Sequence, residues 1–380
     1  MKSTRETTAQ IAIIGGGTIG AATALHLTQR GAQVTIYDRS SPPHSTGSHA
    51  GESRLLRRLP YLEKTPVEQQ LLKNSLASWE ELERQTGQGL ITHCGGLIID
   101  SSKAERLKAL RDLSSQDVEY LPNEEFLTRF PQFQDAASQA AVLDTKAGII
   151  DPQAAISATL ALAKSKGANF SFNNEVQAVE EEANSVRVKS RDGQNYYDGV
   201  IVCAGAYSKQ IIPSLPIIAR RLILGWFRPQ SSHSSWLESA PSFVWTTPEG
   251  TFIYGGPSYD GKTLKIGIDL ELGNVSDPGA ADNLPSETDI AAMRATITEK
   301  FPWLDPAGDR FEVHIDGWSP DKTGLLGSQH NQQKIVLATG WSGYGFKIAP
   351  ELGRIAADIV LGATPNSDLQ ELDPNRFFKA

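Results

Sequence analysis

The chain has 380 residues, of which 44 are acidic and 36 are basic, so its formal net charge is −8. This length predicts two or three domains with an ample hydrophobic core, and the charge argues against nucleic acid or an anionic membrane surface as a partner. The two cysteines, Cys94 and Cys203, have neither metal-type spacing nor the number needed for a disulfide framework. Residues 1–10 are polar, and no segment is long enough to span a membrane or has a signal-peptide layout, so we expect a soluble, cytoplasmic protein without a metal.

The first element is a glycine-rich fingerprint close to the amino terminus. The apolar run 11–14 passes directly into Gly15-x-Gly17-x-x-Gly20, and a helical pattern follows as far as Gly31. This order predicts strand, tight turn and helix, an arrangement that brings a pyrophosphate to the N–H groups and the positive end of the helix dipole. The dinucleotide contacts expected from this stretch are Gly15, Gly17, Thr18, Ile19 and Gly20.

A second strand is predicted over 34–37, directly after the first helix. It ends at Asp38, where a carboxylate accepts both hydroxyls of an adenosine ribose and disfavours a 2′-phosphate. The polar loop 40–58 follows and carries three arginines near its end. Its composition is that of a ligand-facing loop, although such a charge cluster is also typical of a solvated surface.

The middle of the chain alternates helical and strand patterns. Thr65 and Glu68 form a capping box, and apolar residues including Trp79 then recur at helical spacing up to Gly87. Asp151 is placed to cap another helix. The remaining elements expected here are a strand, glycine turn and strand over 91–100, helices over 104–113, 123–130 and 152–165, and a buried strand over 200–204.

From 211 to 311 the pattern is rich in strands, with one helix near 287–300. A last buried strand over 335–338 leads into a glycine-rich turn at 340–347 and a helix through Ile359. This repeats the order of strand, glycine turn and helix N-terminus seen in the opening stretch. We therefore predict an α/β fold in which a Rossmann-type dinucleotide-binding domain is interleaved with an α+β substrate domain built on a mainly antiparallel sheet. The predicted intervals are 1–90, 145–210 and 320–380 for the first domain, and 91–144 and 211–319 for the second.

Four motifs in this order resemble the monomeric sarcosine oxidase and N-methyltryptophan oxidase family. They are the fingerprint, the loop Gly-Ser-His-x-Gly-Glu-Ser-Arg-x-x-Arg at 47–57, the strand Leu-Lys-Ile-Gly at 264–267 and the turn Gly-Trp-Ser-Gly-Tyr-Gly-Phe-Lys at 340–347. The likeness extends from about 11 to 361. It implies an FAD-dependent amine oxidase of the wider D-amino-acid oxidase group.

The resemblance also implies roles for individual residues. Arg57 and Lys347 match the pair that holds the substrate carboxylate over the flavin, and Arg54 matches an arginine beside the flavin ring. Lys265 matches the lysine on the opposite face of the flavin, which promotes reaction with dioxygen, and Tyr254 matches a pocket tyrosine. The expected catalytic residues are Lys265, Arg54, Tyr254 and Asp269, and the expected substrate contacts are Arg57, Lys347, Tyr254 and Trp318. Besides the fingerprint glycines, the expected FAD contacts are Asp38, Arg39, Ser48, Arg54, Val176, Gly205, Trp318, Gly343, Tyr344, Gly345, Phe346 and Lys347.

Two departures from the family pattern change what is expected. Family members attach FAD through a cysteine shortly before the final strand, but Asp316-Gly317-Trp318-Ser319 fills that stretch, so we predict non-covalent FAD. A pocket histidine of the family aligns with Asp269, and a second loop histidine aligns with Ala50. Asp269 either selects a substrate with an additional amine or pairs with a protein arginine.

The predicted reaction is oxidation of an amino acid C–N bond, with a secondary or N-substituted amine preferred. Hydride transfer to flavin N5 gives an imine that hydrolyses, and dioxygen reoxidises the flavin to form hydrogen peroxide. One alternative is an FAD-dependent dehydrogenase that passes electrons to a quinone or carrier protein. The alternative of another class is a non-catalytic flavin-binding or NAD-binding module. The expected partners are a small amine or amino acid and dioxygen, and we expect a monomer.

Overall fold

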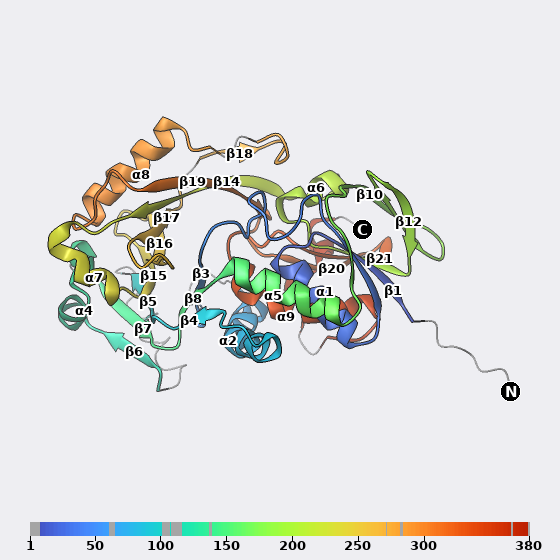
Figure 1. Ribbon diagram of the computed structural model, residues 1–380, viewed down its shortest axis with the longest axis horizontal. Coiled ribbons are helices and arrows are strands. Elements are labelled where there is room, and N and C mark those ends of the chain that lie inside the picture. Colours follow the sequence, from blue (N-terminus) through green and yellow to red (C-terminus); the bar gives the residue numbers. More distant parts are fainter. Residues whose placement is uncertain are drawn as a thin grey trace.

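The computed structural model describes residues 8–60, 65–100, 107, 116–136, 139–270, 272–281, 284–365 and 368–378. The helix predicted over 104–113 falls outside these residues, apart from Leu107. The described part of the chain is elongated and has two lobes. The fingerprint strand β1 belongs to one lobe and helix α8 to the other (Figure 1).

The first lobe is organised around a six-stranded sheet with the order β20-β21-β13-β1-β2-β9. Every neighbouring pair is parallel except β20 and β21, so the carboxyl ends of the central strands meet at one edge, where open α/β sheets bind their ligands. The strands are β1 (Gln10–Ile14), β2 (Gln33–Tyr37), β9 (Asn169–Ser171), β13 (Gly199–Val202), β20 (Leu325–Gln329) and β21 (Gln332–Thr339).

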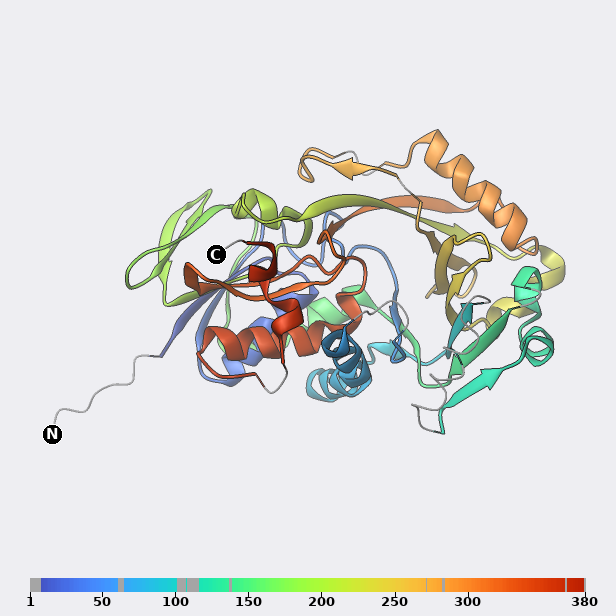
Figure 2. The ribbon, with the colours of Figure 1, turned by 180° about the vertical axis from the view of Figure 1, so that it is seen from behind.

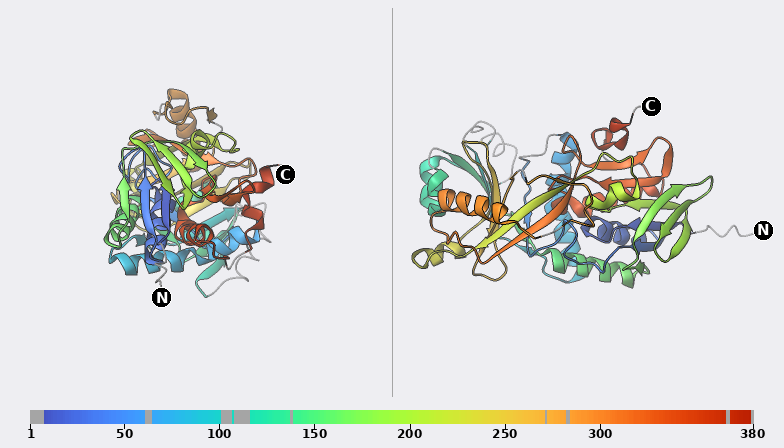
Figure 3. Two further views of the ribbon diagram at one scale, coloured as in Figure 1. Left: turned by 90° about the vertical axis from the view of Figure 1, so that its right-hand side faces the viewer. Right: turned by 90° about the horizontal axis from the view of Figure 1, so that it is seen from above.

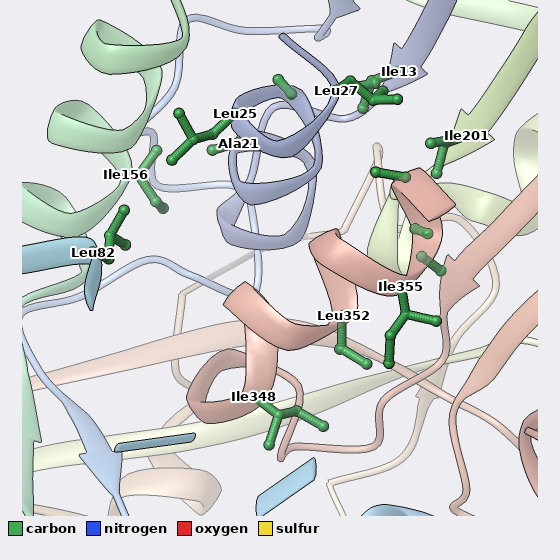
Figure 4. Packing of buried hydrophobic residues seen from close by; sticks show 14 of the residues in the cluster. Ile13, Ala21, Leu25, Leu27, Leu82, Ile156, Ile201, Ile348, Leu352 and Ile355 are labelled. Carbon is green, nitrogen blue, oxygen red and sulfur yellow. The ribbon is translucent and has the colours of Figure 1, made fainter. Parts of the chain in front are cut away.

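Three helices cover one face of this sheet, and a three-stranded meander covers the other. Because side chains alternate along a strand, Ile11 and Ile13 of β1 join the core under the helices, whereas Ala12 and Ile14 join the core under the meander. Figure 4 shows α1 between α5 and α9, with Leu25, Ile156 and Leu352 among the buried apolar side chains of that layer. The elements are α1 (Thr18–Gln29), α5 (Pro152–Ser165), α9 (Ala349–Val360), β10 (Val176–Glu181), β11 (Val186–Ser190) and β12 (Gly193–Tyr197).

Helix α2 (Pro66–Thr86) lies beside this lobe and has the ends that its sequence predicts. Thr65 and Glu68 form the capping box, and Gly87 ends the helix in the left-handed conformation with φ 66°. Trp79 is fully buried, as expected, and its indole N–H donates to the carbonyl oxygen of Lys347 at 2.7 Å. This hydrogen bond ties α2 to the glycine-rich turn near the other end of the chain.

The second lobe contains a large sheet whose order is β18-β14-β17-β16-β15-β5-β7-β6, with β19 paired along β14. All pairs are antiparallel except β5 with β15, so the expectation of a mainly antiparallel sheet is confirmed. The long strands β14 and β19 extend toward the first lobe, as seen from behind and from above (Figures 2 and 3). The strands are β5 (Gly96–Asp100), β6 (Val118–Leu121), β7 (Ala140–Asp144), β14 (Ile218–Phe227), β15 (Ser242–Thr246), β16 (Phe252–Pro257), β17 (Leu264–Ile268), β18 (Asn274–Val275) and β19 (Arg310–Trp318).

The outer face of this sheet carries an aromatic core under short helices, and the inner face turns toward the first lobe. On β17, Leu264, Ile266 and Ile268 join that core. Lys265 therefore points to the opposite, inner face, because neighbouring side chains of a strand alternate. The remaining helices are α4 (Asn123–Arg129), α6 (Ser208–Ile211), α7 (Ser234–Glu238) and α8 (Glu287–Lys300), with short 3-10 turns between elements such as Phe346–Ile348 before α9.

The chain passes from one sheet to another at the junction of the lobes. The strands predicted over 91–100 exist and Gly95 makes the turn with φ 75°, but the two strands do not pair with each other. The first, β4 (Ile91–Thr92), belongs to a small sheet with β3 (Arg54–Leu56) and β8 (Gly148–Ile150), whereas β5 enters the large sheet. Strand pairing depends on distant partners, so local alternation did not reveal that the chain changes sheets here.

Candidate active site

A cavity of about 580 Å³ lies where the carboxyl ends of β1, β2, β13 and β21 meet the inner face of the large sheet. This volume is in the range of ligand sites, about 300–1,000 Å³. Every site residue predicted from the sequence lines this cavity except Gly20. The structure thus brings together positions from 14 to 347 that the sequence separates by more than three hundred residues.

At one end of the cavity the fingerprint turn has no room for side chains. Gly15 has φ 105°, and a Cβ atom there would lie 2.6 Å from the carbonyl oxygen of Cys203. Gly20 does not line the cavity but allows the helix to pack closely on the turn, because a Cβ atom at Gly20 would lie 1.8 Å from the carbonyl oxygen of Gly15. The hydroxyl of Thr18, the first residue of α1, is buried and has no hydrogen-bond partner among the residues that the structure describes. A helix N-terminus with a spare hydroxyl fits a pyrophosphate.

Asp38 lies at the end of β2, where a ribose-binding acid is expected. Its carboxylate accepts hydrogen bonds from the backbone N–H groups of Gly16 at 2.8 Å and Ser40 at 2.9 Å, and His44 Nε2 lies 3.2 Å away. Burial raises the pKa of Asp38, but these hydrogen bonds outweigh burial and hold the pKa below its ordinary value. Arg39 stacks 4.6 Å over the ring of Tyr207, and one of its guanidinium nitrogens, Nη1, is buried and finds no hydrogen-bond partner in the described part of the chain.

The glycine-rich turn after β21 is held by a residue that the site prediction missed. Glu68 is 1% exposed, closes the capping box of α2 and also accepts a hydrogen bond from the Tyr344 hydroxyl. That hydroxyl in turn accepts from the N–H of Gly324 at 3.2 Å. Positive φ values at Ser342 (50°) and Gly343 (91°) shape the turn. The capping-box pattern was visible in the sequence, but nothing there indicated a contact with a turn 276 residues away.

Three cations of the loop and the turn line the cavity, Arg54 half-buried and the other two buried. Arg54 donates to the carbonyl oxygens of Ser48, at 2.7 Å, and Ala50, so its guanidinium is held across the loop. Burial lowers the pKa of Arg54 from its usual value. Arg57 and Lys347 are 7% and 8% exposed and line the same cavity. The loop 40–58 therefore lines the cavity, and its arginines are not a solvated cluster.

Lys265 lines the cavity from the large sheet. It is 7% exposed, its Nζ donates to the carbonyl oxygen of Ser53 at 2.6 Å, and it lies 5.7 Å from the ring centre of Trp226. Burial, and then the nearby positive charge of Arg54, lower the pKa of Lys265 well below its ordinary value. A lysine with this environment is a common feature of functional sites.

Of the two alternatives for Asp269, the structure contains the pairing with a protein arginine, and a contribution to substrate selection stays a prediction. Arg220 Nη2 lies 3.5 Å from Asp269 Oδ1, so this carboxylate pairs with a protein arginine. The same guanidinium stacks 4.0 Å over the Trp318 ring, and Lys322 Nζ lies 5.3 Å from the centre of that ring. Lys322 also lines the cavity, although no sequence pattern singled it out.

The cavity gathers polar atoms that lack partners. Within the described residues, nine buried side-chain nitrogen or oxygen atoms have no hydrogen bond, and five of them belong to residues that line this cavity. Since buried polar groups are normally satisfied, such a concentration indicates a polar ligand. The five atoms are Thr18 Oγ1, Arg39 Nη1, Asp316 Oδ2, Trp318 Nε1 and Trp341 Nε1.

Other kinds of site find no support in the described residues. They contain no group of three or more histidine, cysteine or acidic side chains that could hold a metal ion. None of the described helices has the length and apolarity required to cross a membrane. The Cys94 thiol is half-buried, and burial raises its pKa, which suits a structural role better than that of a nucleophile.

A Rossmann-type crevice closed by an antiparallel sheet defines a dinucleotide-dependent redox protein, and comparisons with known proteins agree. Residues 10–359 match the family described as FAD dependent oxidoreductase, and the chain belongs to this family. It is 29% identical to monomeric sarcosine oxidase of Streptomyces avermitilis, over 98% of this chain and 99% of that protein. It is 28% identical to N-methyl-L-tryptophan oxidase of Salmonella agona, over 96% of this chain and 98% of that protein.

Solved structures show the same fold. The structure of NikD, described as an unusual amino acid oxidase essential for nikkomycin biosynthesis, matches with a TM-score of 0.82 and 22% identity, over 97% of this chain and 98% of that one. The resemblance inferred from four motifs and the predicted fold class are thus confirmed. The protein is an FAD-dependent oxidoreductase whose relatives include amine oxidases, so the alternative of a non-catalytic module is set aside.

FAD is the cofactor, and non-covalent binding is typical of the wider FAD dependent oxidoreductase family, in contrast to the covalent attachment in the narrower sarcosine oxidase family that the sequence resembles. The stretch Asp316–Ser319 contains no cysteine, and of the two cysteines only Cys203 lines the cavity, at the fingerprint end. Burial raises the pKa of the Cys203 thiol to about 12, which leaves it almost entirely protonated and unreactive at neutral pH.

Acid precipitation of the yellow protein is therefore expected to release all its flavin into the supernatant. The absorbance of the supernatant and of the washed, redissolved pellet measures the distribution. Flavin that stays in the pellet after denaturation would contradict non-covalent binding.

Substitution of Gly20 by alanine is expected to prevent tight FAD binding and to destabilise the fold by about 1 to 3 kcal/mol, as overpacking does. The added Cβ would overlap the Gly15 carbonyl oxygen, which is backbone and cannot move aside without opening the turn. Flavin content and thermal unfolding measure the two effects. Gly89→Ala is the matched control, because no atom lies within 4 Å of a Cβ built there; equal behaviour of the two variants would refute this role for the turn.

Proposed function

We propose that this enzyme oxidises the C–N bond of an amino acid, with a secondary or N-substituted amine preferred, and that it uses dioxygen as the electron acceptor. The observation that carries the proposal is the meeting of two kinds of cation in one cavity. Arg57 and Lys347 lie in the loop and the turn of the first lobe, and Lys265 lies on the inner face of the large sheet.

The first pair is suited to a carboxylate. A guanidinium offers a planar fork of N–H groups and an ammonium offers a compact positive charge, and each charge-assisted hydrogen bond contributes about 1.5 to 3 kcal/mol. The backbone contact of Arg57 with the carbonyl oxygen of Leu59 orients its guanidinium, and Lys347 Nζ lies 3.2 Å from the carbonyl oxygen of Tyr344. Positioned in this way, the pair would fix the substrate and leave its amine free to reach the reacting centre.

Bound FAD would accept the hydride, and dioxygen would be reduced to hydrogen peroxide when it reoxidises the cofactor. We assign Lys265 to the dioxygen side, because a buried cation stabilises the negative charge that develops when dioxygen is reduced. Arg54 and Tyr254 also line the cavity and would lie beside the flavin ring. The residues that would hold the nucleotide are Asp38, Arg39, Ser48, Val176 and Gly205. In this proposal residues 1–90, 145–210 and 320–380 form the FAD-binding domain, and 91–144 and 211–319 form the substrate domain.

A peroxide-coupled screen of N-methyl, cyclic and cationic amino acids tests the substrate class. Peroxide formed with amino acids, and not with the corresponding amines that lack a carboxylate, is the expected result. The observed pairing of Asp269 with Arg220 gives no reason to expect a preference for an additional amine in the substrate. Turnover of carboxylate-free amines at equal rates would remove the carboxylate site from the proposal.

The rival candidate is a dehydrogenase that passes electrons to a quinone or carrier protein. It would use the same cofactor and substrate sites, so only the reaction of the reduced enzyme with dioxygen separates the two. The buried position of Lys265 on the inner face favours the oxidase.

A further inference from the structure

A short segment of the second lobe crosses to the first lobe near the fingerprint end of the cavity. This strap, residues 274–281, begins with β18, which pairs with β14, and extends toward α6 (Figures 1 and 2). Most of its residues are exposed, but Pro278 is buried. Val275 and Ala281 pack against the small apolar cluster that includes Ala206 of the first lobe. The strap is therefore docked on the first lobe and does not stand free in solvent.

Two polar links hold the strap in this position. The Tyr207 hydroxyl lies 3.3 Å from the carbonyl oxygen of Pro278 and 3.2 Å from that of Thr46, so its single proton is shared between the strap and the arginine-bearing loop. Burial raises the pKa of Tyr207 above its ordinary value, which keeps this proton in place at neutral pH. In the second link, Asp277 Oδ1 accepts a hydrogen bond from Gln210 Nε2 at 2.6 Å.

The strap also packs against Arg39, the residue that follows the acid at the end of β2. A Cβ atom at Gly279 would lie 3.1 Å from Arg39 Nη1 and 3.3 Å from its Nη2, so only a glycine leaves the guanidinium where it is. The same guanidinium lies 4.6 Å from the ring centre of Tyr207, and Nη2 lies 3.7 Å from Glu175 Oε1. Nη1 is buried and has no hydrogen-bond partner among the described residues. A buried donor without an acceptor is costly, so Nη1 is expected to donate to a ligand.

The strap would act on this ligand through other side chains. None of its residues, all of which the structure describes, lines the cavity, whereas Arg39, Tyr207, Glu175 and Gln210 do. On a Rossmann-type sheet, the carboxyl end of the second strand receives the adenosine half of a dinucleotide. The side chains that the strap supports therefore face that half of the cofactor.

We propose that the strap retains FAD by holding Arg39 and Tyr207 in place at the adenosine half of the cofactor. The FAD site is then built from both lobes, and Tyr207, Asp277 and Gly279 are positioning residues in it. Where no covalent bond holds the cofactor, its residence depends on contacts of this kind. Retention of FAD in this way does not depend on which amine the enzyme oxidises.

The rate at which the oxidised holoenzyme releases FAD tests the strap. Ultrafiltration at intervals after dilution, with the flavin absorbance of the filtrate as readout, measures this rate. Tyr207→Phe is expected to release FAD about fivefold faster than the wild type, as for loss of one neutral hydrogen bond. Gly279→Ala is expected to release it at least about tenfold faster, because the added Cβ displaces a guanidinium that donates a charge-assisted bond.

Each of these variants has a matched control. Tyr196 is 49% exposed on β12 and does not line the cavity, and a Cβ atom at Gly89 meets no atom within 4 Å. Tyr196→Phe and Gly89→Ala should therefore release FAD at the wild-type rate. Wild-type release from Tyr207→Phe and Gly279→Ala, or equally fast release from the controls, would overturn the proposal.

Asp277 separates support by the strap from direct contact of Tyr207 with the cofactor. Asp277→Ala removes the link to Gln210 and also the bond from the N–H of Gly279 to Asp277 Oδ1, at 2.8 Å, and should release FAD severalfold faster. Asp277→Asn keeps an accepting oxygen and should restore the wild-type rate. With the strap loosened by Asp277→Ala, adding Tyr207→Phe should speed release by less than about twofold. Single effects that multiply in full, or equal release from Asp277→Asn and Asp277→Ala, would contradict the role of the strap.

Discussion

Arg57→Met is expected to raise KM for amino acid substrates between about tenfold and 150-fold. This range corresponds to the loss of one charge-assisted hydrogen bond of about 1.5 to 3 kcal/mol in a site shielded from water. Arg57 is 7% exposed and faces the cavity, so water replaces the lost guanidinium poorly. The increase should disappear for amines that lack a carboxylate, because they never gained from the contact. Steady-state kinetics with one amino acid and its decarboxylated analogue measure both effects.

The adjacent arginine is the control for this experiment. Arg58 pairs with Asp144 through its Nε at 2.9 Å and through its Nη2, and it does not line the cavity. Arg58→Met should therefore lower the unfolding temperature, since it leaves a buried carboxylate unpaired, with little change in KM. An unaltered KM in Arg57→Met, or the same increase in Arg58→Met, would remove Arg57 from the substrate site.

Lys265→Met is expected to slow the reaction of reduced flavin with dioxygen about a hundredfold or more, with anaerobic reduction by substrate changed much less. The magnitude is that of removing one preorganised group that stabilises developing negative charge. Lys265 meets the condition for such an effect because it is buried and its Nζ is oriented by the carbonyl oxygen of Ser53. Stopped-flow mixing of the reduced enzyme with aerated buffer isolates this half-reaction.

Lys262→Met is the matched control, since Lys262 is exposed just before β17 and does not line the cavity. Its reoxidation should equal that of the wild type. Slower reduction with normal reoxidation in Lys265→Met would reverse the assignment and place the lysine with the substrate.

Features with a local cause were predicted accurately from the sequence. The fingerprint turn follows from Gly15, which has a positive φ, and from Gly20, where a side chain would overlap backbone, and α2 begins and ends at its capping box and Gly87. Helix α5 has the predicted bounds 152–165, because Asp151 caps it and accepts from the N–H groups of Gln153 and Ala154. The inward position of Lys265 could not come from its own strand pattern and was inferred from the resemblance.

Features that depend on distant partners were not available from the sequence. The pairing of Asp269 with Arg220 joins positions 49 residues apart, and the bond between Glu68 and Tyr344 joins two ends of the chain. The unpaired oxygen of Asp316 became visible only once the surroundings of β19 were known. In each case the outcome depends on which neighbours satisfy a buried charge, and that is decided by tertiary packing.

The most direct test of the account is anaerobic mixing of the FAD-loaded enzyme with N-methyl amino acids, followed by admission of dioxygen. We predict that the visible absorbance of oxidised flavin disappears on mixing and returns rapidly with dioxygen, with one hydrogen peroxide formed for each flavin reoxidised. Flavin that no amino acid reduces, or reduced flavin that dioxygen reoxidises only sluggishly, would contradict the assignment as an amino acid oxidase.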